Sequence, residues 1–426
     1  MEARTLMARA ATKKLAGAAA MAALCALTLW AEKKAAPAPV TDLQPAVRIE
    51  VAPLGYLPPG SFYLTYRLSS EALGFFDNDH LLFTFRVGGL LKRLPNDPAG
   101  DDDQQIRAVV LDVKTGKTVR QTEWRMHDRG PYLWPFVGGK FLVRRRNSLF
   151  LTDESLELQP WLNLSERVRD VQVSPDRAMV VVETDDTAKV QAQAAAPSHL
   201  GTGEPVKVMV LGAESKTPIA QSDGQAPVLL PLMGNGLLDM LEGKLPGYWV
   251  MRDVPFHGDA KLVAQVKSGC RPSVKPLSAT VVLLEGCYLD GNDHQIFVIS
   301  MDGRQLWQDR WENRYVWAWF DTAENGSRFA YESIAVSRPI STFDALYPED
   351  ITGQMVGVYD TESGKLVLVK DVSPVLTAGQ NVALSPDGTR FAVLRNGAIE
   401  IYDLPPVEAP QPQQQKAAEV VAKKKK

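Results

Sequence analysis

The residue types that carry out catalysis are not grouped in this sequence. No two of the five histidines are four residues apart, which is the spacing that a helical zinc motif needs. A glycine-flanked nucleophilic serine and a phosphate-binding glycine loop are both absent from the sequence. The acidic segment 290–294 lacks the ligand order and final glutamate of a calcium-binding hand. The sequence therefore predicts no catalytic residue, no metal site and no cofactor.

Cysteine chemistry is the one covalent feature that the sequence suggests. Cys25 lies in an apolar N-terminal segment, which leaves Cys270 and Cys287 as a pair. In an exported chain such a pair is more often a disulfide than half of a metal site. A bond that closes this loop stabilises the fold by roughly 3 kcal/mol in the chain-entropy model. The alternative is two buried free thiols.

Residues that can bind a partner are concentrated in long insertions at 88–105, 185–205 and 334–354 and in segment 290–294. They combine both charge signs with apolar anchors of the kind that dominates protein interfaces. The candidate binding residues are Lys92, Arg93, Asp101, Asp102, Asp103, Asp293, His294, Arg338, Phe343 and Tyr347. The alternative is that these loops are solvated or pack only locally.

A recurrent strand-turn-strand phrase defines the elements that must position these loops. It occurs seven times, at intervals of 41 to 59 residues, in segments 109–119, 149–159, 208–219, 248–254, 296–307, 356–367 and 398–404. Intervals of this size are typical of propeller blades. The sequence predicts an all-β, seven-bladed β-propeller with four-stranded antiparallel blades over residues 45–404. The fourth copy is the weakest, so six or eight blades remain open.

Two features complete the predicted ring. The final copy lacks an outer strand, and the alternating segment 47–54 is expected to supply it, which would remove a free sheet edge. The Ser-Pro-Asp-Gly phrase at 385–388 predicts a hairpin turn, because proline fixes φ, aspartate bonds the backbone and glycine provides a positive φ. Arg177 replaces that glycine in the related phrase at 174–177.

The Ser-Pro-Asp-Gly hairpin and the Asp-x-x-Thr/Ser-Gly-Lys turns at Asp112 and Asp360 resemble those of the bacterial WD-repeat-like, YVTN and TolB-like propeller superfamily. The resemblance covers roughly residues 45 to 404. The resemblance implies the propeller fold. Members of this superfamily mostly bind proteins, peptides or glycans, and only scattered members are enzymes.

All three insertions are predicted to join the second and third strands of a blade. In up-and-down blades such loops share one face with the connections between blades, and the hairpin turns lie on the opposite face. Cys270 and Cys287 are expected on the insertion face. Four tryptophans at 307, 311, 317 and 319 are expected to pack between blades, with a stacking platform for sugar or peptide as the alternative.

The two ends of the chain have a different composition from the repeats. Basic residues precede the apolar run 15–31, which predicts a signal peptide over 1–31, or a retained membrane anchor. Residues 32–44 read as a disordered linker and 405–426 as a disordered basic tail. We expect export to the periplasm or extracellular space, with membrane contact only through an uncleaved N-terminal segment. The basic residues at both ends leave an acidic body within the net charge of −3, which disfavours nucleic acid as a partner.

These observations favour an exported, non-catalytic propeller that binds a protein or peptide, or a glycan, through its long loops. The alternative is a propeller hydrolase or lyase that acts on a peptide or glycan in the central channel. A cluster of ionisable groups with strongly shifted pKa values in a deep pocket would favour the enzyme.

Overall fold

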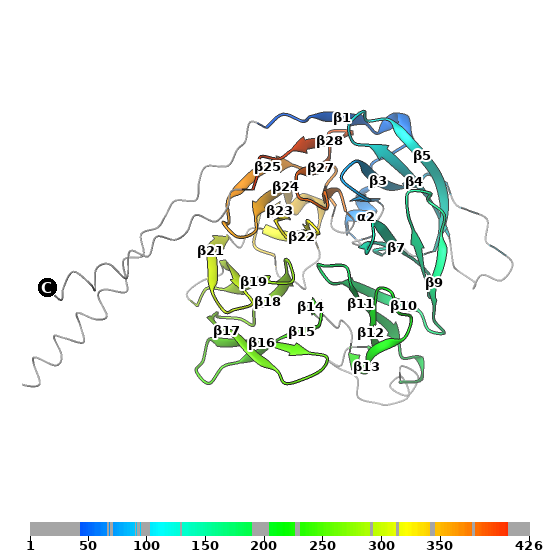
Figure 1. Cartoon of the computed structure of the whole chain (residues 1–426). Coiled ribbons are helices and arrows are strands. Elements are labelled where there is room, and N and C mark those ends of the chain that lie inside the picture. The colour runs from blue at the N-terminus through cyan, green and yellow to red at the C-terminus, as the bar shows by residue number, and fades with distance from the viewer. Residues whose placement is uncertain are drawn as a thin grey trace, which may run out of the picture. The chain divides into compact units, whose positions relative to one another are not determined.

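The computed structural model describes residues 43–407 except 66–67, 69–70, 90, 92–93, 95–102, 128–129, 190–203, 226–230, 290–292, 312–314, 341–345 and 377–379. Within this part of the chain, the strands form seven four-stranded antiparallel sheets arranged as a ring (Figure 1). The prediction of a seven-bladed propeller is confirmed, and the weak fourth repeat forms a complete blade.

The blades are numbered here in chain order. Blade 1 comprises β2 (Glu71–Phe75), β3 (His80–Val87), β4 (Gln104–Asp112) and β5 (Thr118–Met126). Blade 2 comprises β6 (Leu133–Phe136), β7 (Lys140–Arg145), β8 (Ser148–Thr152) and β9 (Gln159–Asn163). Blade 3 comprises β10 (Val168–Val173), β11 (Met179–Asp185), β12 (Pro205–Gly212) and β13 (Pro218–Gln225). Blade 4 comprises β14 (Leu232–Met233), β15 (Gly236–Glu242), β16 (Tyr248–Pro255) and β17 (Lys261–Lys267).

Three further blades close the ring. Blade 5 comprises β18 (Ser273–Pro276), β19 (Val281–Cys287), β20 (His294–Ser300) and β21 (Gln305–Trp311). Blade 6 comprises β22 (Tyr315–Thr322), β23 (Arg328–Val336), β24 (Ile351–Asp360) and β25 (Leu366–Asp371). Blade 7 comprises β26 (Val382–Leu384), β27 (Arg390–Arg395), β28 (Ala398–Asp403) and β1 (Val47–Glu50). Short helices are η1 (Ala52–Leu54) and α2 (Ser61–Thr65), between β1 and β2, and η2 (Pro348–Asp350) in the blade 6 insertion.

The hydrophobic core lies between the blades. Each pair of neighbouring blades shares one apolar cluster of buried side chains. In the cluster between blades 5 and 6, for example, Leu283 and Val298 pack with Phe329 and Tyr331. Because most strands bury apolar residues toward a neighbouring blade, the alternating pattern of the sequence specifies the ring and not seven separate sheets.

The N-terminal strand lies at the outer edge of the last blade. Val47 of β1 is paired with Ile401 of β28, and Glu50 is paired with Ala398. Ile49 and Val51 are buried in the cluster between blades 7 and 1. The first strand of the chain therefore occupies the place that the incomplete final repeat leaves open.

Hairpin turns follow the chemistry predicted from their residues. Asp387 Oδ1 accepts hydrogen bonds from the Ser385 hydroxyl at 2.7 Å and from the Thr389 N–H at 2.9 Å. Gly388 has a φ of 71°. These turns join the first and second strands of a blade, so they lie on one face, which we call the hairpin face. The insertions join second and third strands and share the opposite face, the long-loop face, with the connections between blades.

Candidate functional site

Exposed apolar side chains are concentrated on the long-loop face. Among the described residues, eleven large apolar side chains are exposed, and six of these lie in loops of this face. They are Leu57, Phe62, Leu94, Leu245, Leu289 and Tyr347. The turns of the hairpin face contribute none of the eleven, apart from Val407 at the end of the described chain. Within the described part of the chain, the loops of this face therefore expose more large apolar side chains than the turns of the hairpin face.

The blade 6 insertion is tied to the rest of this face. Arg338 donates two hydrogen bonds to Asp350, at 2.9 and 3.0 Å. Helix α2 packs beside η2, which immediately follows the exposed Tyr347. Leu346 is buried with Ile334 and Val336 in a small cluster of its own. The described part of this insertion is therefore an ordered platform that presents Tyr347.

Several predicted binding residues anchor loops instead of projecting from them. The Asp103 side chain is only 5% exposed and lies against Arg125, His127 and Arg146, at 3.4 Å from the last. These bonds, which outweigh burial, hold the pKa of the Asp103 carboxyl below its ordinary value. Asp103 is thus an internal counter-ion at the base of its loop.

The remaining candidates vary in their surroundings. Asp293 pairs with Arg310, and His294 Nδ1 lies 3.3 Å from Glu285 Oε1. Tyr347 is 46% exposed, and the Arg338 side chain keeps 51% exposure despite its ion pair. Lys92, Arg93, Asp101, Asp102 and Phe343 lie outside the described residues.

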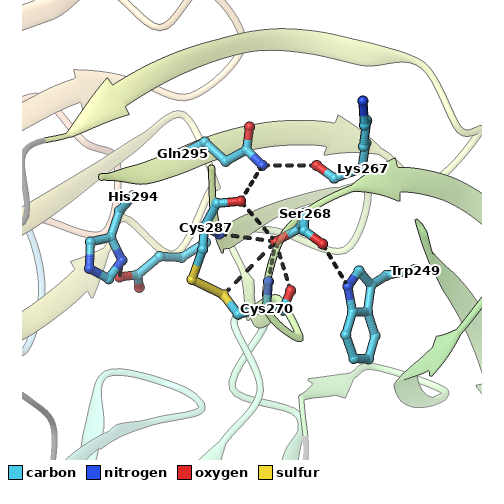
Figure 2. The surroundings of a disulfide bond; sticks show 8 residues. Trp249, Lys267, Ser268, Cys270, Cys287, His294 and Gln295 are labelled. Carbon is cyan, nitrogen blue, oxygen red and sulfur yellow. Dashed lines mark hydrogen bonds and ion pairs between the residues drawn. A yellow bond between two sulfur atoms is a disulfide. The ribbon is translucent and has the colours of Figure 1, made fainter. Parts of the chain in front are cut away.

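The predicted disulfide is present on the long-loop face (Figure 2). Cys270 lies in the connection between blades 4 and 5, and Cys287 ends β19. The buried Ser268 hydroxyl organises the surroundings, because its Oγ accepts the Cys287 N–H at 3.0 Å and lies 2.7 Å from the Cys270 carbonyl (Figure 2). The Trp249 indole N–H donates to the Ser268 carbonyl at 3.1 Å. The bond thus fixes the loops that carry Leu245 and Leu289.

A cavity of about 1130 Å³ occupies the centre of the ring. It is lined by residues of the innermost strands of blades 2 to 6. In blade 4 the innermost strand has only two residues, and Leu237, Leu238, Asp239 and Met240 of β15 line the wall there instead. A volume of this size is ample for a small ligand or a peptide side chain.

Most charged groups at the cavity are paired. Asp239 accepts a hydrogen bond from Arg252 at 2.5 Å. Lys275 Nζ donates to the Tyr331 hydroxyl at 2.6 Å and lies 3.8 Å from Glu285. Burial lowers the pKa of Lys275, and Glu285 opposes this change. Both groups are therefore neutralised by partners within blades 4 to 6.

An ion pair spans the ring near the hairpin face. Arg177, in the first turn of blade 3, lies 2.8 Å from Glu324, in the first turn of blade 6. Arg177 has a φ of 57°, a conformation that disfavours any residue except glycine. The chain thus accepts a strained backbone at the position where an arginine replaces the turn glycine.

Asp321 is the cavity carboxylate that lacks such a partner. It is the penultimate residue of β22 and accepts a hydrogen bond from the Leu384 N–H at 2.8 Å. No described side chain forms an ion pair with it, and Arg177 interacts with it only at longer range. Burial raises the pKa of Asp321 to about 6, against the influence of the Leu384 N–H and of Arg177. Trp319 and Phe320 of the same strand also line the cavity.

Three of the four tryptophans singled out in the sequence have described side chains, and that of Trp317 lies outside the described part. Trp307 and Trp311 of blade 5 pack against Phe329, Tyr331 and Tyr359 of blade 6, as expected for residues between blades. Trp319 is half-buried beside the cluster of blades 6 and 7 and reaches the cavity. The prediction of interblade packing is confirmed for Trp307 and Trp311.

The charged residues of the cavity were not among the residues predicted from the sequence. One feature of the sequence does single out Arg177: it stands in place of glycine in a turn that otherwise repeats the Ser-Pro-Asp-Gly phrase. Asp321 follows a run of aromatic residues at the end of an innermost strand, but only the closed ring shows that this strand end faces a cavity.

A second ionic group lies on the hairpin face. His80 Nδ1 is 3.0 Å from both Asp77 Oδ2 and Glu154 Oε1. The hydrogen bond to Asp77 raises the pKa of His80. These residues have the ligand types of a divalent metal site, but all three side chains are substantially exposed and already pair with one another.

Comparison with known proteins finds likenesses of fold only. No family model matches the sequence, and no curated protein matches it. Solved structures of similar fold include an acylaminoacyl peptidase of Pyrococcus horikoshii, with 11% identity and a TM-score of 0.48 over 85% of this chain and 55% of that one. They also include the C-terminal WD40 domain of Sif2, with 12% identity and a TM-score of 0.38 over 86% and 99% of the two chains.

A putative TolB of Agrobacterium tumefaciens has 12% identity and a TM-score of 0.38 over 68% of this chain and 95% of that one. These likenesses concern the fold alone. This chain spans only about half of the peptidase.

The described residues include no helix that is long and apolar enough to cross a membrane. The N-terminal apolar run 15–31 lies outside the described residues.

Proposed function

We propose that this protein is an exported propeller that binds a protein or peptide partner through its long-loop face. The observation that carries the proposal is the concentration of exposed apolar side chains on that face. Leu57 and Phe62 are 69% and 51% exposed in the connection between blades 7 and 1, and Tyr347 is 46% exposed in the blade 6 insertion. Leu245 and Leu289 are 60% and 48% exposed in blades 4 and 5.

Order in the loops supports this role. The disulfide fixes the loops that carry Leu245 and Leu289, and the Arg338–Asp350 pair fixes the loop that carries Tyr347. Anchors that are already ordered lose little conformational entropy on binding, which favours affinity. The disulfide also supports export, because such bonds persist in oxidising compartments.

A hydrolase acting in the channel is the alternative. Among the described histidines, none lines the cavity, and Asp239, the other cavity carboxylate, is bonded to Arg252. Hydrolysis of a glycan usually needs two carboxyl groups that act together as acid and base or nucleophile. The paired state of Asp239 therefore favours binding over this chemistry.

The test is site-specific photo-crosslinking in the producing cell. A photoreactive phenylalanine analogue is placed at Phe62, Leu289 or Tyr347, and as controls at Val119 and Ile219, which are 54% and 43% exposed on outer strands. We expect one crosslinked partner, identified by mass spectrometry, from the three loop positions and not from the controls. Equal adducts at the control positions, or no adduct at any loop position, would contradict the proposal.

A further inference from the structure

The central cavity contains one carboxylate, Asp321, that forms no ion pair with any residue the structure describes. Asp321 accepts only backbone hydrogen bonds, from the Leu384 N–H at 2.8 Å and from the Thr322 N–H. Arg177 interacts with Asp321 at longer range, but it forms its ion pair, at 2.8 Å, with Glu324, three residues further along the same blade as Asp321. Burying such a group is unfavourable unless a counter-charge is supplied.

The other charges of the cavity do not supply that counter-charge. Lys275 is bonded to Tyr331 and lies near Glu285, and Arg252 is bonded to Asp239. Arg271 also lines the cavity, but it lies in the connection between blades 4 and 5, at the long-loop end, whereas Asp321 lies at the hairpin end of its strand.

One aromatic side chain, that of Trp319, shares the side of the strand that carries Asp321. Trp319 lies two residues before Asp321 on β22. Their paired residues on β23, Glu332 and Ala330, are also two residues apart, so the pairing is regular here. The side chains of Trp319 and Asp321 therefore project to the same side of the sheet. Phe320 also lines the cavity, but it lies on the other side of β22, where Lys275 Nζ is 5.5 Å from the centre of its ring. An aromatic face beside a carboxylate is the arrangement that binds alkylammonium and guanidinium groups.

We propose that the central cavity is a binding site for a cationic group, an alkylammonium or a guanidinium, which pairs with the Asp321 carboxylate beside Trp319. The site is separate from the long-loop face and does not depend on its role. The cation has two sources, a basic side chain of a separate ligand or the lysines at 423–426 of the chain itself. The described chain ends at residue 407 on the hairpin face, to which Asp321 is nearest.

The test titrates the full chain with Nα-acetyl-lysine amide and Nα-acetyl-arginine amide, followed by calorimetry and by tryptophan fluorescence. The neutral analogue is Nα-acetyl-methionine amide. The variants are Asp321→Asn and Trp319→Leu, and the matched control is Asp259→Asn, an exposed carboxylate outside the cavity. Circular dichroism establishes that each variant is folded.

We expect saturable binding of the cationic probes, weakened about tenfold or more by Asp321→Asn and unchanged by Asp259→Asn. A chain ending at residue 407 distinguishes the sources: tighter probe binding by this chain shows that the lysine tail competes for the site, and unchanged binding shows that the cation is external. The proposal is overturned if the neutral probe binds as well as the cationic ones, if Asp321→Asn binds equally well, or if no probe binds.

Discussion

Asp321 allows one prediction whose size follows from the structure. Burial raises the pKa of its carboxyl from 3.8 to about 6 in the folded protein. The native state therefore holds this proton more tightly than the unfolded chain does. For such a group, the free energy of unfolding is highest below about pH 4 and decreases as the pH rises to about 6, as the native state loses the proton. Above that pH the charged carboxylate destabilises the fold.

The magnitude follows from the size of the shift. Each tenfold change in proton affinity corresponds to about 1.4 kcal/mol, so the charged Asp321 destabilises the fold by up to about 3 kcal/mol at pH 8. The variant Asp321→Asn keeps an oxygen that can accept the Leu384 N–H but carries no charge. We expect it to be more stable than the parent by about 2 to 3 kcal/mol at pH 8 and equally stable near pH 4.

The assay is urea unfolding followed by tryptophan fluorescence at both pH values, with Asp259→Asn as the control for a change of charge alone. A gain in stability that is the same at both pH values would refute the reasoning, because it would not derive from ionisation. A loss of stability at pH 8 would show that Asp321 is compensated in a way that its surroundings do not reveal.

Three further perturbations test the ring. Arg328 is 1% exposed and donates hydrogen bonds to Asp360 at 2.8 Å and to the Gly388 carbonyl at 2.7 Å. Arg328→Met leaves the buried Asp360 carboxylate without its ionic partner. It should lower the free energy of unfolding, measured by urea titration, by about 3 to 5 kcal/mol. Reduction of the disulfide, or Cys287→Ser, should cost roughly 3 kcal/mol and lower the thermal midpoint, and an unchanged midpoint would show that the bond restrains only a local loop. Deletion of residues 45–55 should destabilise the whole domain, and a normal unfolding midpoint in calorimetry would contradict the role of β1 in the last blade.

The fold could be predicted because its signals are local and repeated. Each blade depends on alternation of apolar residues and on turn residues such as Asp387 and Gly388, whose conformations are set by neighbours in the sequence. The prediction of the disulfide likewise depended on a simple property of the sequence, an even pair of cysteines, together with the expectation of export.

The cavity could not be predicted in the same way, because its contacts join distant parts of the chain. Arg177 and Glu324 meet only when blades 3 and 6 lie across the ring from each other. Loop position alone also says little about the role of a charge. Asp103 lies at the end of a long insertion, where exposure was expected, but Arg125 and Arg146 surround it.

The antiparallel pairing of β1 with β28 has a mechanical consequence. Val47 is paired with Ile401, so the chain enters and leaves the fold at the same end of this strand pair. A force that pulls the two ends apart would break the hydrogen bonds between β1 and β28 one after another, starting at Val47, and would not load them all at once. The ring should therefore open at low tension by unzipping, whereas force applied between the middles of two other blades must shear their packed apolar surfaces.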